Sequence, residues 1–141
     1  MKRLEEFISE KLKVSKIETN YKPKTKEELV DLIIKEIEAN GPSCSLNHID
    51  VSNITDMSYL FRGGDANKYQ MGHPILSEFD GDISDWDVSS VELFYSMFRN
   101  SIFSGDVSGW KLNPKAKGRI DSMFERSPLE NTLPYWYYKY V

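Results

Sequence analysis

Residues 86–98 read WDVSSVELFYSMF, and residues 49–61 read IDVSNITDMSYLF, so one stretch occurs twice at an offset of 37 residues. Its SMF ending returns at residues 122–124. A second block also repeats, because residues 79–86 read FDGDISDW and residues 103–110 read FSGDVSGW. We therefore expect three degenerate copies of a unit of about 24 residues, a period typical of leucine-rich repeats.

Each unit is interpreted as a strand, a turn and a short helix. The segments 79–83 and 103–107 alternate apolar and polar residues, which favours strands. In copy two, Ser89 and Glu92 have capping-box spacing, and the apolar residues that follow have helical spacing: Val91, Phe94, Tyr95 and Phe98. Such a unit cannot bury its own apolar side, so neighbouring copies must stack.

The fold class expected from this pattern is α/β, a short leucine-rich-repeat-like solenoid of three degenerate strand–turn–helix repeats. The repeats occupy residues 46–126, with an insertion at residues 62–78. Residues 1–45 form a helical N-terminal cap, and residues 127–141 form an aromatic C-terminal cap. Repeat arrays need such caps because the outermost units otherwise expose their apolar faces.

Two helices are predicted in the N-terminal cap. The first has apolar residues at helical spacing: Leu4, Phe7, Ile8 and Leu12. The second begins at a Thr25–Glu28 capping box and ends at Gly41 and Pro42. Its apolar face consists of Leu29, Leu32, Ile33 and Ile37.

The repeat resembles the BspA-type leucine-rich-repeat family of bacterial surface and phage-associated proteins. The matching residues are DIS at 82–84, WDVS at 86–89, MF at 97–98 and DVSNITDMS at 50–58. The helix start PKTKEEL at 23–29 and the SPLE segment at 127–130 also resemble the ends of short family members. This resemblance implies a fold more than a function, and known family members are mostly associated with adhesion or protein–protein contact.

Length and composition limit the class of protein. With 141 residues and 40% hydrophobic content, the chain has the size and composition of one globular domain. No apolar run approaches the ~18 residues that span a bilayer. Glu5 and Glu6 stand where a secretory signal would become apolar. The single cysteine, Cys44, cannot form an internal disulfide. We therefore expect a cytoplasmic protein without a membrane segment.

The net charge of −4 is unevenly distributed. Residues 46–110 hold ten acids and three bases, whereas residues 111–141 hold three acids and six bases. Nucleic acid is not expected as a partner, because an acidic middle segment repels phosphate backbones.

The motifs that could indicate a metal site or a catalytic site are incomplete. The segment DGDISD at 80–85 is similar to a calcium loop, but Asp85 and Val91 stand where an EF-hand needs Gly and Glu. His73 is a loop base with no nucleophile at a recognisable spacing. Trp86, Trp110 and the phenylalanine and methionine positions follow the repeat register and are expected in the core. We therefore expect no enzyme activity, cofactor or metal site.

The expected function is non-catalytic protein binding, located where the repeat is interrupted or charged. The insertion is the first choice, because insertions in repeat proteins form loops that often bind partners. The acidic repeat face is the second. The tail at 135–140 either covers the last copy or presents an aromatic anchor. The candidate contact residues are Tyr69, Met71, His73, Asp82, Asp85, Asp87 and Trp136.

Other functions stay open at this level. The chain could be a phage or mobile-element inhibitor of a host defence enzyme, similar in action to an anti-CRISPR protein. It could also be a surface adhesin, or an enzyme that depends on His73. The sequence leaves the identity of the partner and the oligomeric state open.

Overall fold

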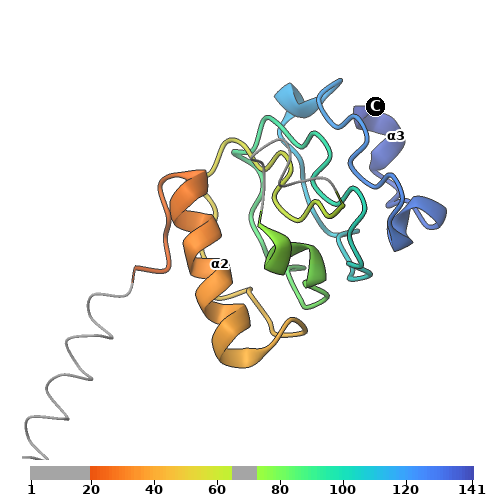
Figure 1. Ribbon diagram of the computed structural model, residues 1–141. Coiled ribbons are helices and arrows are strands. Elements are labelled where there is room, and N and C mark those ends of the chain that lie inside the picture. The colour runs from red at the N-terminus through yellow and green to blue at the C-terminus, as the bar shows by residue number, and fades with distance from the viewer. Residues whose placement is uncertain (1–19, 65–72) are drawn as a thin grey trace, which may run out of the picture.

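The computed structural model describes residues 20–64 and 73–141 (Figure 1). The helical elements in these ranges are α2 (Lys26–Asn40), η2 (Pro74–Glu78), η3 (Pro114–Ala116), η4 (Pro128–Asn131) and α3 (Tyr137–Tyr140), where η denotes a 3-10 helix. The repeat copies lie between α2 at one end and η4 and α3 at the other (Figure 1). The helix predicted around Leu4 and Phe7 falls outside the described residues.

The helix α2 begins and ends where the sequence predicts. Thr25 Oγ1 accepts a hydrogen bond from the Glu28 amide at 3.2 Å, which satisfies a donor of the first turn. The Glu28 carboxylate accepts from the Lys24 amide, one residue before the partner of a regular capping box. Gly41 has a φ of 88° and donates to the Ile37 carbonyl at 2.7 Å, which ends the helix.

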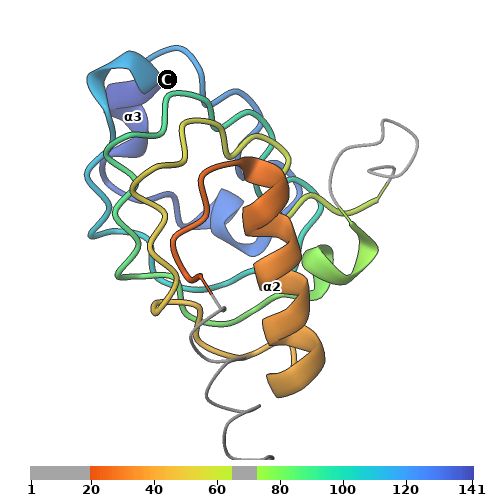
Figure 2. The same cartoon turned by 90° about the vertical axis from the view of Figure 1, so that its left-hand side faces the viewer.

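One face of α2 is buried against the repeats (Figure 2). Leu29 and Ile33 are fully buried, and Ile37 is 4% exposed. Burial of each such side chain contributes roughly 1.5–3 kcal/mol. Lys26 Nζ donates to the Ser58 carbonyl, which ties the start of the helix to copy one. In the part of the chain that the structure describes, α2 therefore packs its apolar face against the repeats.

Successive copies are joined by backbone hydrogen bonds in one register. Amides two residues apart in one copy donate to carbonyls of the next copy at 2.8–3.0 Å. Between copies one and two, the bonds run from Met57 to Leu93, Tyr59 to Tyr95, Phe61 to Met97 and Gly63 to Arg99. Between copies two and three, they run from Phe94 to Arg119, Ser96 to Asp121, Phe98 to Met123 and Asn100 to Glu125.

The predicted α/β leucine-rich-repeat-like solenoid is wrong, because its strands do not form. Within the described ranges, extended pairing is limited to two isolated parallel bridges, Ser45–Asp82 and Asp56–Leu93. Each copy has a left-handed residue at an equivalent position within the segment that bonds to its neighbour. These residues are Tyr59, Ser96 and Ser122, with φ values of 65°, 53° and 60°. Continuous extended backbone cannot pass through such residues.

The short helix predicted in copy two does not form either. Ser96 is left-handed, and a right-handed helix cannot continue through that conformation. The predicted cap also fails, because Ser89 Oγ pairs with Asp87 Oδ1 at 2.6 Å and the Glu92 amide donates to Thr55 in copy one. The buried spacing of residues 91–98 comes from a series of turns instead.

Aromatic rings stack from copy to copy through the core. Phe61, Phe98 and Phe124 hold equivalent positions, with successive ring centroids 5.6 Å apart and ring planes within 8° of parallel. Phe79 and Phe103 stack at 5.9 Å. All five rings are at most 2% exposed, which confirms the prediction that the phenylalanines in the repeat register form the core.

The three tryptophans connect each copy to the one before it. Each indole N–H donates a hydrogen bond to a backbone carbonyl of the previous copy. Trp86 donates to the Leu46 carbonyl at 2.8 Å, Trp110 to the Ile83 carbonyl at 3.1 Å and Trp136 to the Val107 carbonyl at 2.9 Å. The rings are at most 4% exposed. Each bond satisfies the buried indole donor, and the carbonyl that accepts it also accepts a backbone amide of its own copy.

Candidate functional site

The structure places five of the seven predicted contact residues. Asp82, Asp85 and Asp87 are exposed on copy two, and His73 is exposed before η2. The His73 ring accepts from the Ile75 amide at 3.3 Å. Tyr69 and Met71 lie outside the described residues, so their role stays a prediction.

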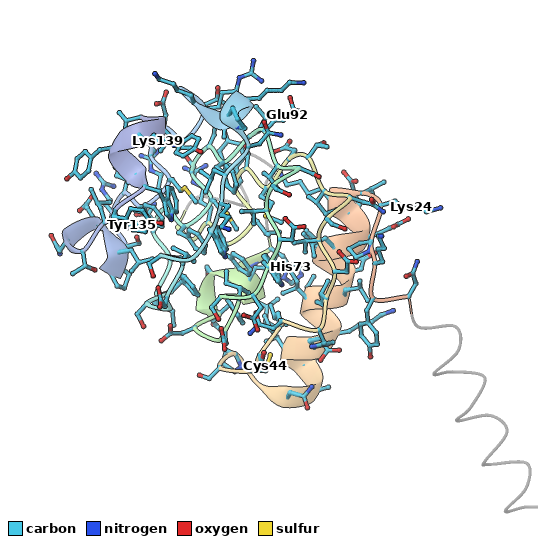
Figure 3. All side chains as sticks on the ribbon, turned by 180° about the vertical axis from the view of Figure 1, so that it is seen from behind. Lys24, Cys44, His73, Glu92, Tyr135 and Lys139 are labelled. Atoms are coloured by element: carbon cyan, nitrogen blue, oxygen red, sulfur yellow. The ribbon has the colours of Figure 1, made fainter. Side chains whose placement is uncertain are left out.

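The aromatic tail combines a cap with an exposed surface. Trp136 is 4% exposed and extends the tryptophan pattern beyond copy three, so it covers the last copy and its ring is not available as a surface anchor. Tyr135 and Tyr138 are 80% and 75% exposed. Figure 3 shows Tyr135 at the end of the molecule opposite α2.

The end of the insertion is part of the packed core. Leu76, in η2, is fully buried, and η2 contacts α2. A Cβ at Gly63 would lie 2.3 Å from the Asn100 carbonyl oxygen, so the chain enters the insertion pressed against copy two. Deletion of the whole predicted insertion would therefore remove core contacts.

Exposed aspartates recur where a serine follows two residues later. In these Asx turns the aspartate Oδ1 accepts from the serine amide, at 2.9 Å for Asp50, 2.9 Å for Asp82, 3.1 Å for Asp87 and 2.8 Å for Asp106. At Asp82, Asp87 and Asp106 the serine hydroxyl also bonds the same oxygen at 2.6 Å. These bonds hold each carboxylate in one position.

The same hydrogen bonds favour the ionised form of these carboxylates. The pKa values of Asp50, Asp82, Asp87 and Asp106 all lie below the ordinary value, and the largest cause is the hydrogen bond from the neighbouring serine. Two pairs are close enough to oppose this effect by charge repulsion, Asp50 with Asp87 and Asp82 with Asp106.

We call these pairs the aspartate columns, Asp50–Asp87 and Asp82–Asp106. Each column joins equivalent positions of neighbouring copies. Both columns include copy two, where Asp82 and Asp87 are five residues apart in the sequence, or roughly 17 Å of fully extended chain at most. The α-carbons of the two columns' copy-two members therefore lie no further apart than that.

Other acids near the columns have structural partners. Asp80 holds copy three, because its carboxylate accepts from the Ser104 amide at 2.8 Å. The Asp85 amide donates to Asn47 in copy one at 3.0 Å, while the Asp85 carboxylate faces solvent. Lys22 Nζ lies 3.7 Å from Asp50 Oδ2, so it partly neutralises the charge at one end of the Asp50–Asp87 column.

The chemistry of the described residues is that of a charged surface. No three His, Cys, Asp or Glu side chains in residues 20–64 and 73–141 are grouped to hold a metal ion. No helix in the part that the structure describes is long and apolar enough to cross a membrane. Cys44 is half-buried, and burial is the main cause that raises the pKa of its thiol.

The family model described as "Mycoplasma protein of unknown function, DUF285" matches residues 43–136. The chain belongs to the DUF285 family. The DUF285 match begins just after α2 and ends at Trp136, so it contains the three copies, both aspartate columns and the last residue of the tryptophan pattern. No match was found among curated proteins or among solved structures.

Sequence reasoning found one half of each column and missed the other. It selected Asp82 and Asp87 for their charge and passed over Asp50 and Asp106. The missed signal was the D-x-S pattern, which occurs at all four positions. A serine two residues after an aspartate predicts an Asx turn and hence a fixed carboxylate.

Proposed function

We propose that this DUF285 protein is a non-catalytic binding module that docks a basic protein surface onto its aspartate columns. The observation that carries this proposal is that four exposed carboxylates are each held in place by a serine two residues later. A side chain that is already ordered loses little conformational entropy on binding. If these aspartate side chains were not held in place, their charge alone would indicate only a solvated acidic surface.

The electrostatics support a basic partner. The aspartates of the columns are ionised at neutral pH, and the repulsion that Asp82 and Asp106 exert on each other is relieved when a cation binds between them. A basic partner is also steered toward the columns, which raises its association rate. The motif resemblance to BspA-type proteins, whose members are mostly associated with adhesion and protein contact, supports binding in preference to catalysis.

Affinity capture with a charge-neutral variant tests this function. The triple variant Asp82→Asn, Asp87→Asn and Asp106→Asn removes three charges but keeps the turns, because an asparagine side-chain oxygen accepts the same amide bond. We expect immobilised wild-type protein to retain a partner from native lysate, and the triple variant to retain at least about tenfold less.

A control of equal charge makes the result specific. Glu27→Gln, Asp31→Asn and Glu38→Gln change three exposed acids of α2, away from the columns. This control should retain the partner as the wild type does. If the column variant captures as much partner as the α2 control, the columns are not the binding surface.

We also propose that binding takes place in the cytoplasm, as the lone thiol of Cys44 suggests. Fractionation of the native host decides this point, and recovery from the culture medium or cell envelope would overturn it in favour of an adhesin.

A further inference from the structure

Copy three has a backbone edge that the described residues leave without acceptors. In copy two, the amides of Phe94, Ser96 and Phe98 donate to carbonyls of copy three. The equivalent amides of copy three belong to Ile120, Ser122 and Phe124, and none of these donates to any acceptor in residues 20–64 or 73–141. The fourth position of the row, Arg126, donates instead to the Glu130 carboxylate at 3.1 Å.

A hollow lies beside this edge, where a fourth copy would continue the stack. Its volume is about 270 Å³, and its lining consists of Ser122, Phe124, Glu125, Glu130, Leu133 and Tyr137. Three of the lining residues belong to copy three, and Glu130, Leu133 and Tyr137 belong to the η4–α3 region. Ser122 and Phe124, whose amides donate to nothing in the described ranges, therefore both line the hollow.

The surroundings of the hollow are acidic. Asp121 and Glu130 both act on Tyr137, where they add to the effect of burial in raising the pKa of the phenol. Neither carboxylate forms an ion pair within the described ranges. Glu125, in contrast, forms an ion pair with Arg99, whose Nε lies 3.4 Å from Glu125 Oε2. The apolar part of the wall is Leu133 with the edge of Phe124. A basic side chain with an apolar neighbour fits this lining.

We propose that the hollow binds an extended basic peptide segment of a partner protein, which takes the place of a fourth copy. Carbonyls two residues apart in the peptide accept from Ser122 and Phe124, as Asp121 and Met123 accept from Ser96 and Phe98 one copy earlier. This is backbone recognition at an exposed edge. A lysine or arginine of the peptide meets Glu130 and Asp121. The site is separate from the aspartate columns and does not depend on them.

Amide hydrogen exchange tests the open edge directly. In the free full-length protein, we expect the Ser122 and Phe124 amides to exchange at least about tenfold faster than their bonded equivalents, Ser96 and Phe98. The probe is a synthetic peptide that copies residues 117–126, KGRIDSMFER, because this segment already fills the same edge of copy two. A scrambled peptide of the same composition is the control.

At saturating peptide, the exchange of Ser122 and Phe124 should slow at least about tenfold, while Ser96 and Phe98 stay unchanged. The variant Glu130→Gln should weaken peptide binding by roughly twofold to fivefold, the range of an exposed ion pair. The triple aspartate-column variant should bind the peptide as the wild type does, so failure of the columns and failure of the hollow are separate results.

Three results would overturn the proposal. The first is equal exchange of Ser122 and Ser96 in the free protein, which would mean that the edge is closed. The second is equal binding of the copied and scrambled peptides. The third is protection of Ser122 that grows with protein concentration alone, together with a dimer in sedimentation, because the occupant would then be a second copy of this chain.

Discussion

Trp86 donates its indole N–H to the backbone carbonyl of Leu46 at 2.8 Å, across the boundary between copies one and two. The same bond recurs from Trp110 to Ile83 and from Trp136 to Val107. Each copy is therefore tied to the previous one by a buried polar contact as well as by aromatic packing.

The variant Trp110→Phe tests how much this contact contributes to the free energy of unfolding. It removes the indole donor, leaves the Ile83 carbonyl with only the Trp86 amide, at 3.2 Å, as its donor and opens a small cavity. We expect a loss of about 2–4 kcal/mol in the free energy of unfolding, measured by urea denaturation. Tyr135→Phe, at an 80% exposed position, is the control and should change stability by less than about 0.5 kcal/mol. A loss below 1 kcal/mol at Trp110 would show that the bond contributes little.

The variant Gly81→Ala tests how closely copies one and two approach. A Cβ at position 81 would lie 1.8 Å from the Cys44 carbonyl oxygen, so one backbone must move. We expect destabilisation of about 1–3 kcal/mol or more. Gly109→Ala is the matched control, because nothing lies within 4 Å of its added Cβ. Its effect should be close to neutral, and equal effects of the two variants in thermal unfolding would contradict this packing.

Acid should destabilise the protein through the Asx turns. The pKa values of Asp82, Asp87 and Asp106 are depressed in the folded state, so their contribution is fully present above the ordinary aspartate value of 3.8. It is lost as the pH falls through the lower, folded pKa values, because the unfolded state binds more protons there. Urea midpoints measured from pH 7 to pH 2 should therefore fall on the acid side.

The triple Asn variant is the control for this pH dependence. It keeps the turns but has no carboxylates to protonate at these positions, so its acid destabilisation should be weaker than that of the wild type. Parallel curves for the two proteins would mean that the lowered pKa values do not stabilise the fold.

Sequence reasoning predicted local features well where the signal was local. The start of α2 at Thr25 and its end at Gly41 follow from side-chain capping and from the freedom of glycine at positive φ. Burial of Phe98 and Trp110 follows from the repeat register. These features need no knowledge of how neighbouring copies stack in space.

The features that were mispredicted or missed depend on how copies stack. Helical spacing at 91–98 arises equally from turns that pass through left-handed Ser96, so periodicity alone could not distinguish a helix from this arrangement. The aspartate columns exist only because Asp50 lies beside Asp87 in the next copy. The Ser122 amide, which donates to no acceptor among the described residues, becomes recognisable only when Ser96 is seen to donate across the stack.

The dependence of association rate on salt tests the aspartate columns most directly. The captured partner is mixed with wild-type protein and with the triple Asp82→Asn, Asp87→Asn and Asp106→Asn variant at increasing ionic strength. We predict that the wild-type rate falls at least about tenfold from low to high salt and that the variant rate is lower and nearly flat. Equal rates with equal salt dependence would contradict binding through the columns.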